Sequence, residues 1–360
     1  MAQALVKKNK KVIILGYDPT VNEDTVSKDE GIIVHRLYDS YEKKKPFRIG
    51  RFYISLAPFR KRYSLSKELE NLIVTYKPDC IESYDWSGPL WLKPSVHLVV
   101  RMHGANAAYK YYEGLRSSKL IKFFEKRNLV MADSVIAVSD HVGAITKRAF
   151  KLASHYTVIH NSTDTNQFKP QQNVKRDYNQ ILYVGRIVKR KGLIELFKVL
   201  NILFDLNPNL YVRLAGRRNE EFINELLQLI EASKLNRVQF LDFIPNKDLP
   251  ELYSRAGVFV MPSRAEAFGI TAIEAMSCAT PVVLTIKASG PEIVDQGKDG
   301  YLLDFTNFRE SAEKLNGLLL DKAKLHAFGV AGREKVIKKF STEVINSQNM
   351  GFYEKEKGGV

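Results

Sequence analysis

The sequence of 360 residues is poor in cysteine: Cys80 and Cys278 are the only two, and they lie far apart. Neither belongs to a CxxC pair or a Cys/His cluster, so the sequence indicates neither a disulfide framework nor a zinc site. We expect two buried, reduced thiols. No run reaches the roughly 18 apolar residues of a transmembrane helix, and the apolar residues 12–15 are too few for a signal peptide. We therefore expect a cytoplasmic protein.

Several familiar catalytic motifs are also missing. The chain has no GxxxxGK[ST] loop, no GxGxxG after a predicted strand, no GxSxG elbow and no HExxH. It also has no Asp-x-Asp pair of the kind that holds a divalent ion against a diphosphate. Any chemistry on a diphosphate would therefore use fixed cations and backbone amides, and we expect neither a metal nor a cofactor.

What the chain does have is a globular composition with a large excess of positive charge. Hydrophobic residues make up 45% and charged residues 26%, which excludes wholesale disorder, collagen and a coiled-coil rod. The length predicts two domains. The 55 basic residues outnumber the 40 acidic ones, for a net charge of +15. This balance favours an anionic partner: nucleic acid, a phosphorylated substrate or an acidic membrane face.

Short β-branched segments alternate with helix-length periodic segments, which predicts parallel sheets covered by helices on both faces. The expected strands are residues 12–15, 31–36, 79–82, 98–102, 134–138, 156–160, 180–184, 210–215, 238–241, 257–261 and 281–284. The expected helices are residues 64–76, 115–131, 140–150, 193–207, 220–235, 248–255, 270–278 and 309–320.

A polar stretch at residues 162–180 separates two such alternations. We therefore expect an α/β protein with two Rossmann-like, doubly wound domains, residues 1–165 and 166–340. A last helix in 341–360 would cross back toward the first domain. Open α/β sheets bind ligands beyond the carboxyl ends of their strands, so we expect the site in a deep cleft between the two domains.

Two segments of the second half have residues that suit a diphosphate. In the first, a predicted strand ends at Gly185 and a helix begins near Gly192, with Arg186 and Lys191 between them. An arginine can hold a phosphate with two hydrogen bonds, and a lysine adds a point charge. The alternative is a solvated basic loop.

The second segment follows a predicted strand that ends at Met261. Gly269 would permit a close backbone approach, and the helix that starts near Ile270 offers free amides and the positive end of its dipole. Glu266 precedes this helix. Glu274 lies about one turn inside it among apolar residues, where a buried carboxylate needs partners such as ribose hydroxyls. The alternatives are an exposed loop acid for Glu266 and a structural salt bridge for Glu274.

These segments resemble a known family. The pattern Pro-Ser-x-x-Glu-x-Phe-Gly-x-x-x-x-Glu-Ala-Met at residues 262–276 is similar to the signature of retaining glycosyltransferases of family 4, which have the GT-B fold. Residues 185–192 resemble the diphosphate loop of that family, 159–170 its interdomain linker, 132–139 the preceding strand and 290–300 its late glycine-rich loop. The resemblance is strong over residues 130–305 and weaker before them.

The resemblance implies a role for each matching residue. Arg186 and Lys191 would neutralise the donor diphosphate, Glu274 would bind the ribose, and Glu266 would contact the transferred sugar. His103, in a loop after a predicted strand, would contact that sugar from the first domain. The other residues expected to face the donor are Phe268, Gly269, Ile270 and Thr271.

The implied reaction is retaining, metal-independent transfer of a sugar from a nucleotide-sugar to a hydroxyl of a glycan or lipid-linked saccharide. The setting would be cell-envelope or polysaccharide synthesis, lipopolysaccharide included. One departure concerns the first strand: many members follow it with a glycine pair, whereas this chain has Gly16 alone. Gly16 is nevertheless the expected place for the backbone to approach donor or acceptor.

The excess charge is concentrated in the first half, where the acceptor is expected. Residues 1–170 contain 28 Lys/Arg and 17 Asp/Glu, against 27 and 23 in the remainder. Basic residues interleaved with aromatic ones suit an anionic membrane, which predicts a peripheral protein on the inner face of the cell membrane; a soluble basic face is the alternative. The densest basic cluster contains no acid and comprises Lys43, Lys44, Lys45, Arg48, Arg51, Arg60, Lys61 and Arg62.

Two other functions compete with glycosyl transfer. A nucleic-acid-binding protein would use the same basic and aromatic residues, but it leaves Glu266 and Glu274 unexplained and no nucleic-acid motif is present. We therefore expect no nucleic-acid partner. A sugar-nucleotide epimerase, or another non-transferring GT-B enzyme, would share the donor site but return isomerised donor rather than a glycosylated acceptor.

Overall fold

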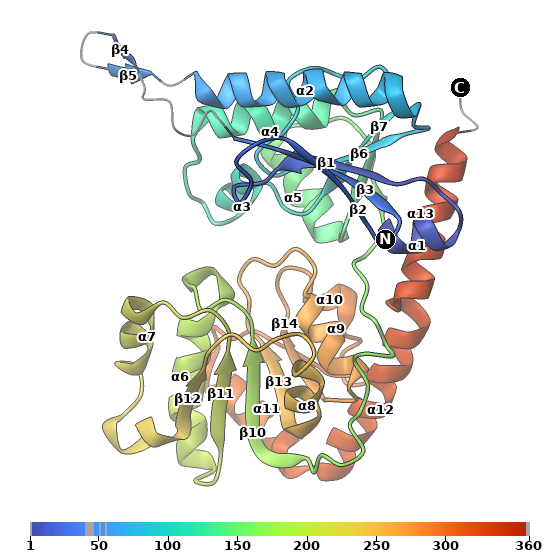
Figure 1. Cartoon of the computed structure of the whole chain (residues 1–360). Helices are drawn as coiled ribbons and strands as arrows, with labels where there is room; N and C mark the ends of the chain where they lie inside the picture. Colours follow the sequence, from blue (N-terminus) through green and yellow to red (C-terminus); the bar gives the residue numbers. More distant parts are fainter. Residues whose placement is uncertain (1, 40–46, 50–51, 55, 358–360) are drawn as a thin grey trace. The chain divides into compact units, whose positions relative to one another are not determined.

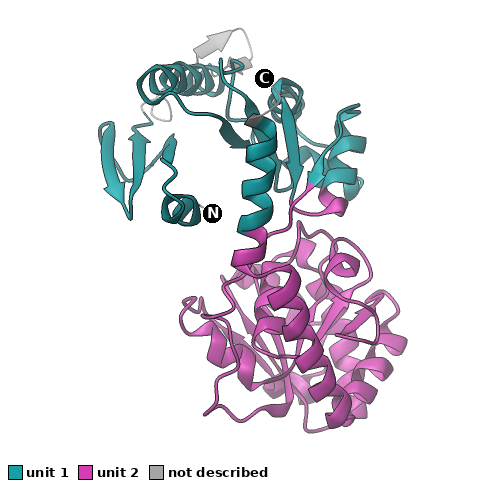
Figure 2. Cartoon of the chain, turned by 90° about the vertical axis from the view of Figure 1, so that its right-hand side faces the viewer, with its two compact units in different colours: residues 1–137, 143–157, 346–360 teal, residues 138–142, 158–345 magenta. Residues whose placement is uncertain are grey.

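The computed structural model describes residues 2–39, 47–49, 52–54 and 56–357, and the chain forms two compact units (Figures 1 and 2). Unit 1 comprises Met1–Ala137, Gly143–Thr157 and Asn346–Val360, and unit 2 comprises Val138–Val142 and Val158–Ile345. The last helix, α13 (Thr342–Lys357), therefore begins in unit 2 and continues in unit 1. The domain limits that the sequence predicts are 165/166 and 340/341, a few residues from the limits of these units.

Unit 2 contains a six-stranded sheet in the order β12-β11-β10-β13-β14-β15, and every neighbouring pair is parallel. The strand order reverses between β10 and β13, which is the topological switch point where open α/β sheets bind ligands. The strands are β10 (Asp177–Val184), β11 (Tyr211–Ala215), β12 (Val238–Leu241), β13 (Ala256–Met261), β14 (Val282–Thr285) and β15 (Tyr301–Leu303).

Helices cover both faces of this sheet (Figure 1). Successive residues of a strand point to opposite faces, so Ile181 and Tyr183 of β10 belong to one apolar cluster and Leu182 to another. The first cluster includes α6 (Leu193–Leu206) and α11 (Phe308–Leu320). The second includes α8 (Leu249–Arg255) and α9 (Ile270–Ser277), and α12 (Lys322–Lys339) contributes to both. The α/β class predicted from the sequence is confirmed.

Unit 1 contains smaller sheets. One has the order β1-β3-β2, from β1 (Ile13–Tyr17), β2 (Thr25–Asp29) and β3 (Ile32–Leu37), and β2 is antiparallel to β3. The other has the order β6-β7-β8-β9, in which β6, β7 and β8 are parallel. Its strands are β6 (Ile81–Tyr84), β7 (Leu98–Met102), β8 (Ser134–Ala137) and β9 (Thr157–Val158), while β4 (Phe47–Ile49) and β5 (Phe52–Ile54) form a hairpin.

The remaining helices differ in how well the sequence predicts them. Helix α5 (Asp140–Phe150) lies where it is expected, and α4 (Lys119–Met131) and α2 (Ala57–Tyr76) differ from the prediction at their first residues. Helix α7 (Glu220–Leu227) is shorter than predicted, because a 3₁₀ segment, η2 (Ala232–Arg237), follows it. The break has a tertiary cause: the side chain of Asn201 accepts a hydrogen bond from the amide of Glu231 at 3.0 Å. The short helices are α1 (Ala2–Lys7), α3 (Asn106–Tyr112) and α10 (Gly290–Ile293).

Three further expectations are wrong. Residues 12–15 are predicted to be a buried strand, but Ile14 of β1 is 43% exposed. Gly31, predicted in a strand, lies in the two-residue turn between β2 and β3, and its φ of +87° favours glycine. Cys80 is only partly buried, whereas Cys278 is buried; both are free thiols.

Within the described ranges, no helix is long and apolar enough to cross a membrane.

Candidate functional site

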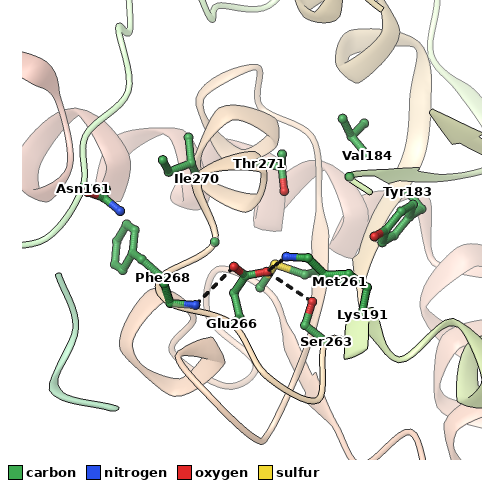
Figure 3. Close-up of a pocket in the computed structure, with 13 residues that line it drawn as sticks. Asn161, Tyr183, Val184, Lys191, Met261, Ser263, Glu266, Phe268, Ile270 and Thr271 are labelled. Carbon is green, nitrogen blue, oxygen red and sulfur yellow. Dashed lines mark hydrogen bonds and ion pairs between the residues drawn. The ribbon is translucent and has the colours of Figure 1, made fainter. Parts of the chain in front are cut away.

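A pocket of about 200 Å³ lies in unit 2 at the switch point of the six-stranded sheet (Figure 3). The end of β10 and the end of β13 form its walls, together with the loop that leads into α9. This is where a doubly wound sheet is expected to bind its ligand. The residues that line it are Asn161, Tyr183, Val184, Gly185, Lys191, Met261, Ser263, Glu266, Ala267, Phe268, Gly269, Ile270 and Thr271.

Glu266 is the most connected side chain of this pocket. Its Oε2 forms an ion pair with the Nζ of Lys191 and accepts a hydrogen bond from the Oγ of Ser263 at 3.3 Å (Figure 3). The Lys191 and Glu266 side chains are only 15% and 14% exposed. Glu266 is therefore not an exposed loop acid, and the structure brings it together with Lys191 from a segment 75 residues away.

Close backbone packing places Lys191 beside Glu266. Lys191 ends a short 3₁₀ turn, η1 (Lys189–Lys191), and Gly192 follows with a φ of +70°. A Cβ on Gly192 would lie 2.0 Å from the carbonyl oxygen of Pro262, so only glycine allows the two loops to approach this closely. The carbonyl of Arg190 also accepts a hydrogen bond from the amide of Arg264 at 3.1 Å.

The first turn of α9 supplies a second source of positive charge. Gly269 precedes the helix with a φ of +103°, and a Cβ there would lie 2.9 Å from the Met261 side chain. Gly269, Ile270 and Thr271 all line the pocket. The first amides of a helix have no partner within it, and the helix dipole makes this end positive. The pocket is therefore suited to an anionic group.

Glu274 lies in the second turn of α9 and is 8% exposed. Its Oε2 accepts a hydrogen bond from the hydroxyl of Tyr253 at 2.9 Å. Burial raises the pKa of Glu274 to about 7, and the Tyr253 hydrogen bond opposes that rise. Its observed partner is a hydroxyl rather than the cation of a structural salt bridge. Glu274 is not among the residues that line the pocket.

Two other residues of the predicted donor site differ in their placement. The Arg186 side chain is exposed and does not line the pocket, although Gly185 does; the carbonyl of Arg186 accepts a hydrogen bond from the Tyr183 hydroxyl at 2.9 Å. Phe268 lines the pocket but is fully buried, and its ring centroid lies 5.0 Å from that of His160. Phe268 therefore packs as a core residue.

The two predicted residues of the first domain lie in unit 1. His103 is exposed in the loop after β7, and its amide donates a hydrogen bond to the Oδ1 of Asp85 at 2.9 Å. Gly16 lies within β1, opposite Arg36 of β3, rather than in a loop after the strand. A Cβ on Gly16 would have no atom of the described residues within 4 Å, so no contact that the structure describes requires glycine at this position.

Sequence reasoning missed some residues that line the pocket. Asn161 is assigned from the sequence only to the linker, and Tyr183 only to a strand, yet both line it. Ser263, which hydrogen-bonds Glu266, lies inside the family pattern and was identifiable from it. Asn161 belongs to unit 2 and lies in the segment that precedes β10.

Comparison with known proteins identifies the family. Residues 164–335 match the family described as "Glycosyl transferases group 1", and residues 1–167 match "Glycosyltransferase Family 4". The chain belongs to these glycosyltransferases. An uncharacterized glycosyltransferase of Bacillus subtilis, YqgM, is 30% identical over 233 residues, which are 64% of each chain. The first curated relatives are matched over only 64–65% of their own length.

Solved structures show that this glycosyltransferase has the GT-B fold. Sucrose-phosphate synthase from Thermosynechococcus elongatus superimposes with a TM-score of 0.78 at 23% identity, over 100% of this chain and 92% of that one. The Anabaena protein HepE in complex with UDP and glucose has a TM-score of 0.68 at 19% identity, over 90% and 87% of the two chains. The GT-B fold predicted from the sequence is confirmed.

The raised pKa of Glu274 predicts a measurable pH dependence of stability. Between its ordinary pKa of 4.5 and about 7, native Glu274 retains a proton that the unfolded chain has released. The free energy of unfolding therefore falls as the pH rises through this range, and the part due to Glu274 is about 3 kcal/mol. Urea unfolding between pH 4 and 8 measures this free energy. In Glu274→Gln it should decrease less with rising pH than in the wild-type protein, by the amount due to Glu274.

The matched control is Glu251→Gln on the neighbouring helix α8. The Glu251 side chain is 62% exposed and pairs with Arg255, so this variant should keep the wild-type pH dependence. A Glu274→Gln protein that also kept the wild-type dependence would contradict the assignment of a raised pKa to Glu274.

Proposed function

We propose that the protein transfers a sugar from a nucleotide-sugar to a hydroxyl of a glycan or lipid-linked saccharide. The observation that carries this proposal is the pocket in which Lys191, Glu266 and the first turn of α9 face one another at the switch point of unit 2. A diphosphate needs such fixed positive charge. The family supports the transferase class, and the binding of UDP and glucose by HepE supports a nucleoside diphosphate as the leaving group.

The Lys191–Glu266 ion pair suggests how the donor would bind. An incoming diphosphate competes with Glu266 for the Lys191 ammonium, and it also accepts hydrogen bonds from the first amides of α9. The Glu266 oxygens then become acceptors for hydroxyls of the sugar. The Glu274 carboxylate, which has one observed donor in Tyr253, accepts hydrogen bonds from the ribose. The exposed Arg186 side chain lies next to Gly185 and closes on the diphosphate from outside.

Lys191→Ala tests the donor site. Losing one preorganised charge contact to the leaving group should lower the turnover about 10²–10³-fold and weaken the binding of nucleoside diphosphates. Calorimetric titration with UDP, ADP and GDP, and release of nucleoside diphosphate from the matching nucleotide-sugars, measure the two effects.

Lys189→Ala is the matched control, because Lys189 belongs to the same 3₁₀ turn but is 66% exposed and pairs with Glu225. It should retain both binding and turnover. Full binding and turnover in Lys191→Ala would overturn the assignment of this pocket to the donor diphosphate.

The proposed transfer is metal-independent and retains the anomeric configuration of the donor. Lys191 and the α9 amides supply the charge that a divalent ion would otherwise bring to the diphosphate, and the family resemblance supports retention. The rate should therefore be unchanged by excess EDTA, and NMR of the product should show the anomer of the donor sugar. Strict dependence on an added divalent ion contradicts the first part, and isomerised donor without a glycosylated acceptor supports the epimerase alternative.

The acceptor is proposed to lie at an anionic membrane, but the predicted basic cluster is only partly visible. Lys43, Lys44, Lys45, Arg48 and Arg51 lie outside the residues whose side chains the structure describes. Lys61 forms an ion pair with Asp39, and the Arg62 guanidinium donates hydrogen bonds to the carbonyls of Gly88 and Pro58, each at 2.8 Å. These two cations are therefore engaged within unit 1, and Arg60 is exposed.

Residues 110–126 offer a better exposed surface of the same kind. This segment runs from the end of α3 through about the first two turns of α4. Exposed apolar side chains include Leu115 at 58% and Phe123 at 49%. Its acids are Glu113 and the fully buried Glu125. Apolar and basic side chains on one surface are typical of helices that bind anionic lipid, and the cations here are Lys110, Arg116, Lys119, Lys122 and Lys126.

Reversing three of these charges should weaken membrane binding. Each lysine near an anionic surface contributes about 1 kcal/mol, so Lys119→Glu, Lys122→Glu and Lys126→Glu together should lower the partition coefficient at least about 100-fold. Co-sedimentation with phosphatidylglycerol vesicles measures it. The control variant carries the same charge change in unit 2, at the exposed residues Lys247, Lys338 and Lys339. Equal binding of the two triple variants would contradict a membrane role for residues 110–126.

A further inference from the structure

A buried carboxylate of unit 1 holds the start of the loop that carries His103. This loop, residues 103–105, connects β7 to α3 (Asn106–Tyr112). Asp85 follows β6, the parallel neighbour of β7, and is fully buried. Its Oδ1 accepts a hydrogen bond from the amide of His103 at 2.9 Å, and its Oδ2 accepts one from the amide of Gly104 at 3.2 Å.

A second buried carboxylate holds the first turn of α3, directly after this loop. Glu125 of α4 is also fully buried. Its Oε1 and Oε2 accept hydrogen bonds from the amides of Asn106 and Ala107, both at 3.0 Å. Its Oε1 also accepts one from the amide of Ser87 at 3.2 Å. The two carboxylates therefore hold the start of the His103 loop and the first turn of α3 that follows it, and Glu125 joins this turn to the segment that follows Asp85.

The loop has little freedom to adopt another path. Gly104 has a φ of +102°, and a Cβ there would lie 2.2 Å from the Tyr109 ring. In the neighbouring turn, Gly88 has a φ of +53°, and a Cβ there would lie 2.1 Å from the carbonyl oxygen of Phe124. Both glycines therefore lie in close contact with a neighbouring ring or backbone. These contacts, together with the two carboxylates, restrict the backbone conformation of both segments.

This arrangement is costly for stability. Among the described residues, neither Asp85 nor Glu125 forms an ion pair, and their observed hydrogen-bond partners are backbone amides. Burying a carboxylate is unfavourable. Burial raises the pKa of Asp85 to about 7, and it also raises the pKa of Glu125, where the positive charge of Arg62 opposes the rise. A loop that served only to connect two elements could fold without such a cost.

We propose that Asp85 and Glu125 are positioning residues that fix the backbone at His103, and with it the position from which His103 would contact the transferred sugar. The inference rests on the proposed function together with the sugar contact that the family resemblance implies for His103. Neither carboxylate touches substrate. Each acts through the backbone amides that it accepts.

Asp85→Asn and Glu125→Gln test the inference, because each amide side chain replaces one acceptor oxygen by a donor that faces a backbone amide. A displacement of the reacting group by a fraction of an ångström to about 1 Å should lower kcat about 10–100-fold. The affinity for nucleoside diphosphate should stay at the wild-type value, because that pocket belongs to unit 2. Hydrogen exchange of the amides in residues 103–107 should become faster in both variants.

Asp133→Asn is the matched control. The Oδ2 of Asp133 accepts a hydrogen bond from the amide of Leu98 at 2.9 Å, at the opposite end of β7. The variant breaks the same kind of contact on the same strand but leaves the His103 loop intact. It should keep the wild-type kcat and the wild-type exchange of residues 103–107. If Asp85→Asn does not fold, Glu125→Gln alone decides the outcome.

The outcomes separate the inference from the function on which it rests. Wild-type kcat in both variants, with faster exchange of residues 103–107 and a large loss of kcat in His103→Ala, would overturn the inference alone. Equal loss of kcat in Asp133→Asn would overturn it as well, since the effect would then be general. Absence of sugar transfer by the wild-type protein, or full transfer by His103→Ala, would instead overturn the proposed function.

Discussion

The contact between Gly192 and the carbonyl of Pro262 is the constraint on which the pocket of unit 2 depends. The two residues lie in loops that follow β10 and β13, the strands between which the sheet reverses its order. With a Cβ only 2.0 Å from that carbonyl, no other residue fits. Because the loops meet here, Lys191 contacts Glu266, and the N-terminus of α9 lines the same pocket. A single glycine thus links the topology of the sheet to the electrostatics of the site.

The charged side chains of this pocket neutralise one another within the chain. Lys191 and Glu266 neutralise each other in a largely buried pair, while the amides at the start of α9 keep the pocket positive. A neutral pair costs less to bury than either charge alone. In the proposed function, a diphosphate would therefore meet a cation that is already ordered, and its binding to Lys191 would release the Glu266 carboxylate.

Sequence reasoning found the parts of this site that depend on local spacing. Gly269 and Glu266 follow from the residues between a strand and a helix, and Lys191 from a loop of fixed length. The direction of a side chain is not a local property, so the exposure of Arg186 was not predictable. Neither was the break after α7, because it depends on Asn201 of another helix. The place of β1 at the edge of its sheet depends on the order of the strands, which the residues 12–15 alone cannot predict.

Buried carboxylates occur in both units, and the number of donors around each one distinguishes their roles. Burial raises the pKa of both Glu274 and Asp85 to about 7, so each is costly to ionise. Asp85 accepts hydrogen bonds from successive backbone amides, which leaves little acceptor capacity for a ligand. Glu274 has one observed donor, the Tyr253 hydroxyl, and a carboxylate can accept about four. A buried carboxylate whose oxygens already accept hydrogen bonds from the chain is therefore suited to positioning a segment. A buried carboxylate with few donors around it is suited to binding a ligand.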